Sequence, residues 1–295
     1  MSDSGLLLID KPEGPSSHDV VDAVRRKIGY RTVGHTGTLD PMASGLLLIC
    51  IGKMTRLAEY LVGHDKEYLA GVSLGTTTNT FDATGKVLET CGVATDKPSV
   101  QRILARFLGS TLQRPPSFSA VRIEGQRAYK LARQGREVNL DERPVEVHRL
   151  ELVHFDPPDL TLDVRCSAGT YVRSLAHDLG QALGCGAHLS RLRRTACGPF
   201  SVEQALKLEA LAESDSWRDF LLPPAEALTG LPTLRLTHDE AELLGHGRMV
   251  PFRDGARPEA DDERTYRAVR ENGELLAVVL PDHEGGVFRP RKVLG

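Results

Sequence analysis

The sequence predicts an α+β fold, because apolar residues recur with the two-residue period of strands in some segments and with the helical period in others. Residues 160–166 alternate between apolar and polar side chains, and residues 68–74 show a similar, weaker alternation. Residues 17–28 and 172–183 instead carry apolar side chains on one helical face. A chain of 295 residues is longer than the usual single domain, so we expect one large domain and one small one.

Sheet is expected to dominate the beginning of the chain. Residues 6–9 form a short apolar strand, and a helix capped by Ser17 follows and closes at Gly29. A buried strand is expected at residues 46–51 and a half-buried one at residues 68–74. A second amphipathic helix is then expected to begin at Ser99.

The strand at residues 160–166 leads through the turn Gly169-Thr170 into a helix that ends at Gly184. Beyond the Pro-containing connectors at residues 222–224 and 230–232, the pattern changes to an acidic helix followed by short strands. These last elements are expected at residues 238–244, 266–269 and 275–279. We therefore divide the chain into residues 1–230 and residues 231–295, and we expect Asp261-Asp262-Glu263 to form a solvated loop.

Composition places the chain among ordinary soluble globular proteins, with 40% hydrophobic and 26% charged residues. Its early apolar run, Leu6–Ile9, is too short for a bilayer span or a secretory signal, so a cytoplasmic location is expected. The five cysteines are odd in number and show no C-x-x-C spacing, which argues against a disulfide framework and a zinc ribbon. We expect them to be buried free thiols.

Positive charge is concentrated in two segments, although the net charge is −3. Residues 101–136 hold eight basic side chains and a single acid, Glu124. A second basic cluster comprises His188, Arg191, Arg193 and Arg194. A solvated face is the ordinary explanation of a charge run, but two basic blocks in a mildly acidic protein favour a phosphate-rich partner, either RNA or DNA.

Residues 34–48, Gly-His-Thr-Gly-Thr-Leu-Asp-Pro-Met-Ala-Ser-Gly-Leu-Leu-Leu, place one acid, Asp40, in a stretch of small and turn-forming residues. Pro41 biases Asp40 away from helix, so its carboxylate is expected on an irregular loop. Such a loop suits chemistry, but an Asp before Pro also often just satisfies a turn.

Arg173 is expected in the first turn of its helix, where the helix dipole disfavours a cation by a few tenths to about 1 kcal/mol. An anion partner, either Asp40 or a phosphate, would explain the position. An exposed arginine with no particular partner explains it equally well on this argument alone.

Six segments in order resemble the motifs of one family, the bacterial tRNA pseudouridine-55 synthases, called the TruB family. Residues 34–47 resemble its catalytic motif and residues 5–12 its opening strand. The remaining segments are Lys66-Glu67-Tyr68, residues 113–120 (Gln-Arg-Pro-Pro-Ser-Phe-Ser-Ala), residues 169–173 and residues 184–189. Together the matches cover most of residues 5–200, and their common order makes coincidence a poor explanation.

The resemblance implies a pseudouridine synthase fold: a large, mainly antiparallel mixed sheet flanked by helices and loops, plus a small C-terminal β-rich barrel like PUA domains. It implies isomerisation of uridine 55 in the T loop of tRNA, without cofactor or metal. The implied partner is the T arm and loop of tRNA, with no obligate protein partner, and a separate tRNA-folding role could coexist. Residues from about 101 to 136 would then clamp the RNA.

The resemblance also assigns residues. Asp40 matches the catalytic carboxylate, and whether it attacks the sugar, attacks the base or promotes a glycal-like intermediate stays open. Arg173 would pair with Asp40, and His35 would brace the gap left by the flipped base. Three residues would lie near the base: Tyr68 as the stacking ring, Tyr171 and Leu192. The expected RNA contacts are Arg122, Arg127, Lys130, Arg133, Arg193 and Arg194.

Each assignment has an ordinary alternative. Tyr68 could be a half-buried structural tyrosine, and His35 a structural histidine, since no second and third metal ligand accompany it at suitable spacing. A nucleotide-binding loop at Gly52-Lys53 fails, because Leu47 and Met54 occupy positions that need Gly and Ser or Thr. A non-catalytic RNA-binding protein and a synthase acting on guided RNA with protein partners are the remaining alternatives. The chain has no obvious basic tail for such partners.

Overall fold

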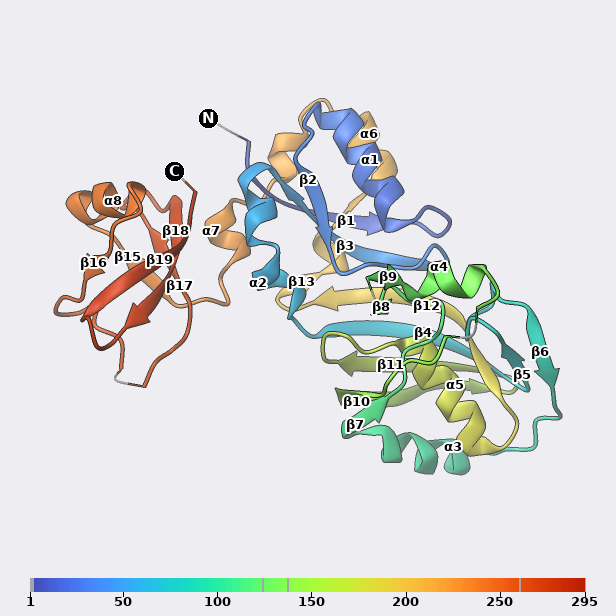
Figure 1. Cartoon of the computed structure of the whole chain (residues 1–295). Helices are drawn as coiled ribbons and strands as arrows, with labels where there is room; N and C mark the ends of the chain where they lie inside the picture. The colour runs from blue at the N-terminus through green and yellow to red at the C-terminus, as the bar shows by residue number, and fades with distance from the viewer. Residues whose placement is uncertain (1–2, 124, 137, 260, 295) are drawn as a thin grey trace.

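The computed structural model describes residues 3–294 apart from residues 124, 137 and 260, and it contains two separate main sheets (Figure 1). The first has ten strands, most of them antiparallel, with β1 pairing β14 and β12 pairing β3 in parallel. Its main path runs β14 (Leu206–Lys207), β1 (Gly5–Lys11), β3 (Ala43–Ile51), β12 (Ala187–Cys197), β4 (Lys66–Leu74), β11 (Asp159–Cys166), β10 (Arg143–Asp156) and β7 (Gly109–Gln113). Off this path, β2 (Val33–Thr36) pairs with β3 and β13 (Phe200–Ser201) with β12. The predicted α+β class is confirmed.

One face of the large sheet is covered by helices. Val20, Val21 and Val24 of α1 (Ser17–Ile28) pack on this face together with Leu175 and Leu179 of α5 (Val172–Leu183). The core continues under α3 (Lys97–Leu104), so a single apolar layer runs beneath all three helices. The smaller helices are α2 (Glu59–Val62), α4 (Ala128–Arg133), α6 (Leu208–Glu213) and α7 (Pro224–Ala227), with 3₁₀ turns at η1 (Gly52–Leu57), η2 (Ala105–Phe107), η3 (Val202–Gln204) and η4 (Trp217–Phe220).

The C-terminal ends of the two long helices and the N-terminal end of α1 follow local rules. Gly29 and Gly184 close α1 and α5 in the left-handed conformation that glycine favours, as predicted. The N-cap of α1 is Ser16, one residue before the predicted Ser17, because Ser16 and Asp19 form a reciprocal capping box. Likewise α3 begins at Lys97 rather than at Ser99, because the Asp96 side chain accepts a hydrogen bond from the Ser99 amide.

The C-terminal sheet packs against the opposite face of the large sheet. Its five strands run in the order β15 (Thr233–Arg235), β17 (Tyr266–Val269), β18 (Leu275–Asp282), β19 (Val287–Val293) and β16 (Val250–Pro251), next to α8 (His238–Gly245). Val269, Leu275 and Val278 share one apolar cluster with Leu46 and Leu48 of β3. Arg291 of β19 adds an ion pair to Glu59 of α2, so the small sheet also contacts this helix. The boundary between residues 230 and 231 stays a prediction.

Two predicted exposures are wrong. Cys91 is exposed, whereas the other four cysteines are buried, and all five are free thiols. Asp262, expected in a solvated loop, is 7% exposed and accepts hydrogen bonds from Arg264 and from the Tyr266 hydroxyl. A local charge run could not reveal that one of its members turns inward to meet these two partners. No helix in the described part of the chain is long and apolar enough to cross a membrane.

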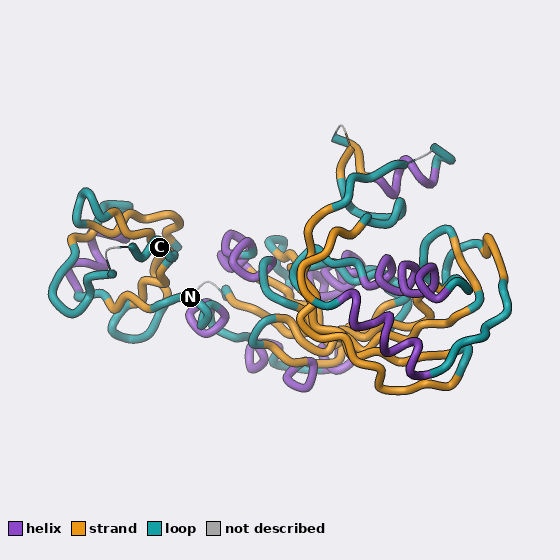
Figure 2. The backbone as a smooth tube through the Cα atoms, turned by 90° about the horizontal axis from the view of Figure 1, so that it is seen from below, coloured by secondary structure: helices purple, strands orange, loops and turns teal. Residues whose placement is uncertain are grey.

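Between β7 and β10, residues 114–142 leave the sheet and form a projecting segment, which we call the arm (Figure 2). It contains the strand pair β8 (Arg122–Ile123) and β9 (Gln126–Arg127), followed by α4. A second small strand pair, β5 (Thr76–Thr78) and β6 (Val87–Thr90), extends from the end of β4. The expected basic segment, residues 101–136, therefore covers the end of α3, η2, β7 and most of the arm, with Glu124 outside the described residues.

Candidate active site

Asp40 lies on an irregular loop between β2 and β3 that neighbouring segments hold from several sides. The Ser17 hydroxyl donates to the Leu39 carbonyl at 2.9 Å and accepts from the Leu39 amide at 2.8 Å. The Gly14 amide donates to the Pro41 carbonyl at 2.8 Å, and the buried ammonium of Lys11 lies 3.5 Å from the same oxygen. The loop is therefore fixed on both sides of Asp40.

Gly45 lets the strand after this loop approach β12 closely. Its φ is +100°, and a Cβ there would lie 2.2 Å from the Arg194 carbonyl oxygen. Arg194 in turn sends its Nη2 to the Gly37 carbonyl at 3.0 Å and its Nε to the Leu46 carbonyl at 2.7 Å. The Arg194 side chain therefore connects Gly37, just after β2, with Leu46 in β3.

Arg194 was expected to contact RNA on the surface, but it is only 2% exposed. The alternation of β12 turns it inward, where its hydrogen bonds to two carbonyls satisfy the buried guanidinium. Arg193 points to the other face and forms two hydrogen bonds to Asp10, at 3.0 and 2.8 Å. Counting charges along the segment could not distinguish these two neighbouring arginines.

The Asp40 carboxylate meets Arg173, as the sequence suggested. Oδ2 of Asp40 lies 2.9 Å from Nε of Arg173, whose side chain is 7% exposed, whereas that of Asp40 is 36% exposed. Withdrawal from water raises the pKa of Asp40, and the charge of Arg173 opposes this rise. The result is an oriented carboxylate that still has access to solvent.

Arg173 uses its remaining nitrogens to join two other segments, the turn at residues 80–82 and the arm. Nη1 donates to the Thr80 carbonyl at 3.1 Å and lies 3.6 Å from Oδ2 of Asp82. Nη2 donates to the Phe118 carbonyl in the arm at 3.0 Å. This set of partners explains how a cation is retained in the first turn of α5.

Asp82 is a site residue that the sequence analysis missed. Its side chain is 6% exposed, and one oxygen accepts from the hydroxyls of Thr80 at 2.8 Å and Thr84 at 2.6 Å. In sequence, an acid between threonines and before Gly85 looks like a turn-forming residue. Only the fold brings it to Arg173, so the sequence carried no specific signal for it.

Two of the expected base-contacting residues lie on adjacent strands of the large sheet. Tyr68 on β4 is 9% exposed and is the register partner of Arg194 on β12. Leu192, 6% exposed, pairs with Ala43 just after the loop and with Ala70 of β4. Burial raises the pKa of Tyr68 to about 12, so its hydroxyl stays protonated at neutral pH.

Tyr171 and His35 complete the surroundings. Tyr171 precedes α5 and is half-buried, and its pKa is raised by burial, with the charges of Arg173 and Asp40 acting on it in opposite directions. His35 lies on β2, which pairs with β3, and burial lowers its pKa, so its imidazole is neutral at pH 7. Its Nδ1 has no hydrogen-bond partner among the described residues.

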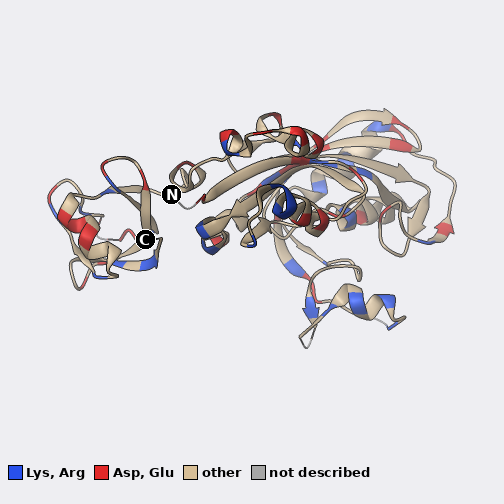
Figure 3. Ribbon diagram, turned by 90° about the horizontal axis from the view of Figure 1, so that it is seen from above, with Lys and Arg blue, Asp and Glu red and all other residues tan. Residues whose placement is uncertain are grey.

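Four expected RNA contacts lie together on the arm: Arg122, Arg127, Lys130 and Arg133, here called the arm cluster. All four are exposed on β8, β9 and α4, and Figure 3 shows this concentration of basic residues on the projecting segment. Arg133 lies over the ring of Tyr129, with 5.6 Å between its guanidinium carbon and the ring centroid. Among the described residues, which exclude Glu124, the four side chains of the arm cluster form no ion pair.

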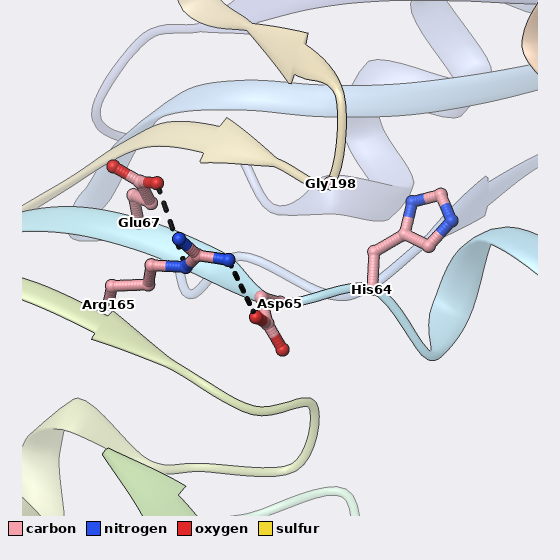
Figure 4. A pocket seen from close by; sticks show the side chains of 5 residues that line it. All are labelled: His64, Asp65, Glu67, Arg165 and Gly198. Carbon is pink, nitrogen blue, oxygen red and sulfur yellow. Dashed lines mark hydrogen bonds and ion pairs between the residues drawn. The ribbon is translucent and has the colours of Figure 1, made fainter. Parts of the chain in front are cut away.

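A small polar pocket of about 160 Å³ opens elsewhere, at the ends of β4 and β11 (Figure 4). Arg165 occupies it and pairs with Asp65 at 3.2 Å and Glu67 at 3.9 Å. None of its lining residues belongs to the expected site. Among the described residues, no three His, Cys, Asp or Glu side chains form a group that could hold a metal ion.

Residues 25–172 match the TruB family pseudouridylate synthase (N terminal domain), and residues 173–229 match the tRNA pseudouridylate synthase B C-terminal domain. A tRNA pseudouridine synthase B of Burkholderia pseudomallei (strain 668) is 42% identical over 98% of this chain and 96% of its own. One of Haemophilus influenzae (strain PittEE) is 38% identical over 98% and 95%.

In structure, the chain resembles one in the crystal structure of a Cbf5-Nop10-Gar1 complex, with a TM-score of 0.77 and 27% identity. The match covers 98% of this chain and 84% of that one, so it includes the C-terminal sheet. The predicted fold, a pseudouridine synthase sheet with a small PUA-like β unit, is confirmed by this likeness. With both family domains present and near-complete coverage of its relatives, the chain belongs to the TruB family of pseudouridylate synthases.

Proposed function

We propose that this protein is a stand-alone tRNA pseudouridine synthase that converts uridine 55 in the T loop of tRNA to pseudouridine, with Asp40 as its catalytic carboxylate. Family membership makes it an isomerase of uridine in RNA. The names of its relatives support tRNA as the substrate. The observation that carries the role of Asp40 is its ion pair with Arg173, on a fixed loop that still reaches solvent.

The reaction breaks the bond between C1′ of the ribose and N1 of uracil and forms a bond between C1′ and C5. The proton displaced from C5 is balanced by the one gained at N1, so no oxidant or co-reactant is needed. A carboxylate can start this exchange by attacking the sugar or the base, or by promoting loss of a sugar proton. All three routes require Asp40 ionised and aimed, which Arg173 supports through charge and through Nε.

The surrounding side chains suit a base that has left its stack. In this proposal Tyr68 stacks on the uracil, Leu192 and Tyr171 border it, and His35 braces the RNA from which it came. A neutral imidazole and a protonated phenol suit these roles, because neither adds charge beside the base. We propose that Arg194, which is buried, shapes the loop that carries Asp40 instead of contacting phosphate.

The arm cluster is proposed to hold the T arm through its phosphates, and the large catalytic unit with its arm is proposed to span residues 1–230. RNA contact by residues 231–295 is proposed on the likeness to PUA domains.

The test uses purified protein and an unmodified tRNA transcript, with pseudouridine mapped by sequence position. Conversion at position 55 without added metal or nucleotide supports the assignment. Conversion at another position, or none with wild-type protein, contradicts it.

A further inference from the structure

Gln113 lies at the root of the arm and has no role in the site described so far. It is the last residue of β7 and pairs with Arg143, the first residue of β10, so the arm leaves and rejoins the sheet at this pair. Although Gln113 is polar, it is only 5% exposed. A buried amide needs hydrogen-bond partners for both its ends.

Both partners are supplied by the main chain of Tyr171. The Tyr171 amide donates to Oε1 of Gln113 at 2.7 Å, and Nε2 of Gln113 donates to the Tyr171 carbonyl at 3.1 Å. Because one side chain supplies an acceptor and a donor to the same residue, it fixes the position of that peptide segment and its rotation. A hydrocarbon side chain of the same length could fill the space but could not make these bonds.

Tyr171 is the residue from which α5 starts. Its carbonyl also accepts the Leu175 amide at 3.1 Å, the first hydrogen bond of the helix. Arg173 follows two residues later and reaches Asp40 with Nε at 2.9 Å. The amide of Gln113 therefore sets the start of the helical turn that delivers Arg173 and the ring of Tyr171 to the carboxylate.

We propose that Gln113 is a positioning residue for the isomerisation, holding the main chain of Tyr171 so that Arg173 and Tyr171 stand correctly beside Asp40. The proposal rests on the catalytic role proposed for Asp40. It also links the arm to the chemistry, because the residue that fixes Tyr171 is the one at which the arm departs. A misplacement of about 1 Å in such an arrangement can cost on the order of 10²-fold in rate.

The test compares Gln113→Met with Gln113→Asn and with the control Ser174→Ala. Met keeps the length and loses both bonds, whereas Asn keeps the amide on a shorter side chain. Ser174→Ala breaks another tie between α5 and the arm root, the 2.8 Å bond from its hydroxyl to the Arg114 carbonyl. It leaves the Gln113 contacts with Tyr171 in place. Single-turnover rate, tRNA affinity and melting temperature are measured for all three.

We expect Gln113→Met to lower the single-turnover rate at saturating tRNA by at least about 10-fold, with tRNA affinity within about 2-fold of wild type. Gln113→Asn should lie between Met and wild type, and Ser174→Ala should stay within about 2-fold. If Gln113→Met does not fold, the split between rate and affinity in Gln113→Asn decides. An unchanged rate in folded Gln113 variants overturns the proposal, as does an equal loss in Ser174→Ala.

The pH dependence of the single-turnover rate distinguishes a displaced Arg173 from a general loss of rigidity. If Arg173 moves away from Asp40, the pKa of Asp40 rises. The decline of the rate on the acid side of the pH profile then moves to higher pH in Gln113→Met. A lower rate with an unmoved acid limb contradicts the proposal. Activity of Asp40→Asn would instead defeat the proposed function itself, whatever the Gln113 variants do.

Discussion

Replacing Arg173 by lysine tests the ion pair at the centre of the site, because lysine keeps the charge and removes the geometry. Arg173 uses Nε for Asp40, Nη1 for the Thr80 carbonyl and Nη2 for the Phe118 carbonyl, at 2.9, 3.1 and 3.0 Å. A single ammonium cannot reach all three, so at least one buried carbonyl loses its donor or Asp40 loses its partner.

The magnitude follows from the geometry. The ammonium of lysine cannot occupy the position of Nε beside Asp40 while also serving the two carbonyls, and a misplacement of about 1 Å at a reacting centre can cost on the order of 10²-fold in rate. We therefore expect a single-turnover rate roughly 100-fold below wild type, which corresponds to about 2.7 kcal/mol at about 1.4 kcal/mol per tenfold.

The assay is rapid mixing of excess enzyme with tRNA labelled with tritium at C5 of uracil, because the label is released when C5 forms its new bond. The matched control is Arg149→Lys. Arg149 also binds two carboxylates, those of Glu67 at 2.7 Å and Asp163 at 2.9 Å, but has no contact with the Asp40 loop. It should retain the wild-type rate. A rate for Arg173→Lys within about 3-fold of wild type would refute the reasoning.

Three further predictions concern pH, salt and stability. Because the pKa of Asp40 is raised and the reaction needs its ionised form, the rate should fall with decreasing pH at values above those of an ordinary aspartate, and a rate that is flat down to pH 4 would exclude this. Replacing the four residues of the arm cluster by glutamine should weaken tRNA binding and should reduce the steepness of log affinity against log salt concentration by about 0.7–0.9 per lost phosphate contact. The single-turnover rate at saturating tRNA should change little. An unchanged slope in filter-binding measurements would show that the arm is not part of the interface. Asp262 has a lowered pKa because of Arg264 and Tyr266, so its stabilisation is fully present above the unfolded-state pKa and is lost progressively as pH falls from there through the lower folded-state pKa. Asp262→Asn should therefore lower the melting temperature at pH 7 more than at pH 3, and equal losses at both would contradict this.

Much of the fold could be predicted because its local signals agree with its packing. The alternation of residues 160–166 matches β11, and the apolar face of residues 172–183 matches α5, with Gly184 ending it. The residue at which each helix begins was less predictable. At α1 two adjacent serines compete for the cap, and only the reciprocal bonds between Ser16 and Asp19 decide between them.

The site was predictable mainly through the family motifs. The place of Arg173 in a first helical turn was equally compatible with an exposed arginine, the resemblance selected Asp40 as its partner, and the structure shows that ion pair. Asp82 and Arg194 were not predictable in this way. Asp82 reaches the site through a turn whose composition is ordinary, and the inward direction of Arg194 depends on the register of β12 with β3 and β4.

Single-turnover conversion of tRNA by Asp40→Asn tests the central claim most directly. Asparagine keeps the shape of the side chain and removes the charge that Arg173 faces. The account predicts that this variant folds, binds unmodified tRNA with an affinity close to wild type, and forms no pseudouridine at position 55. Substantial formation of pseudouridine by Asp40→Asn would contradict it.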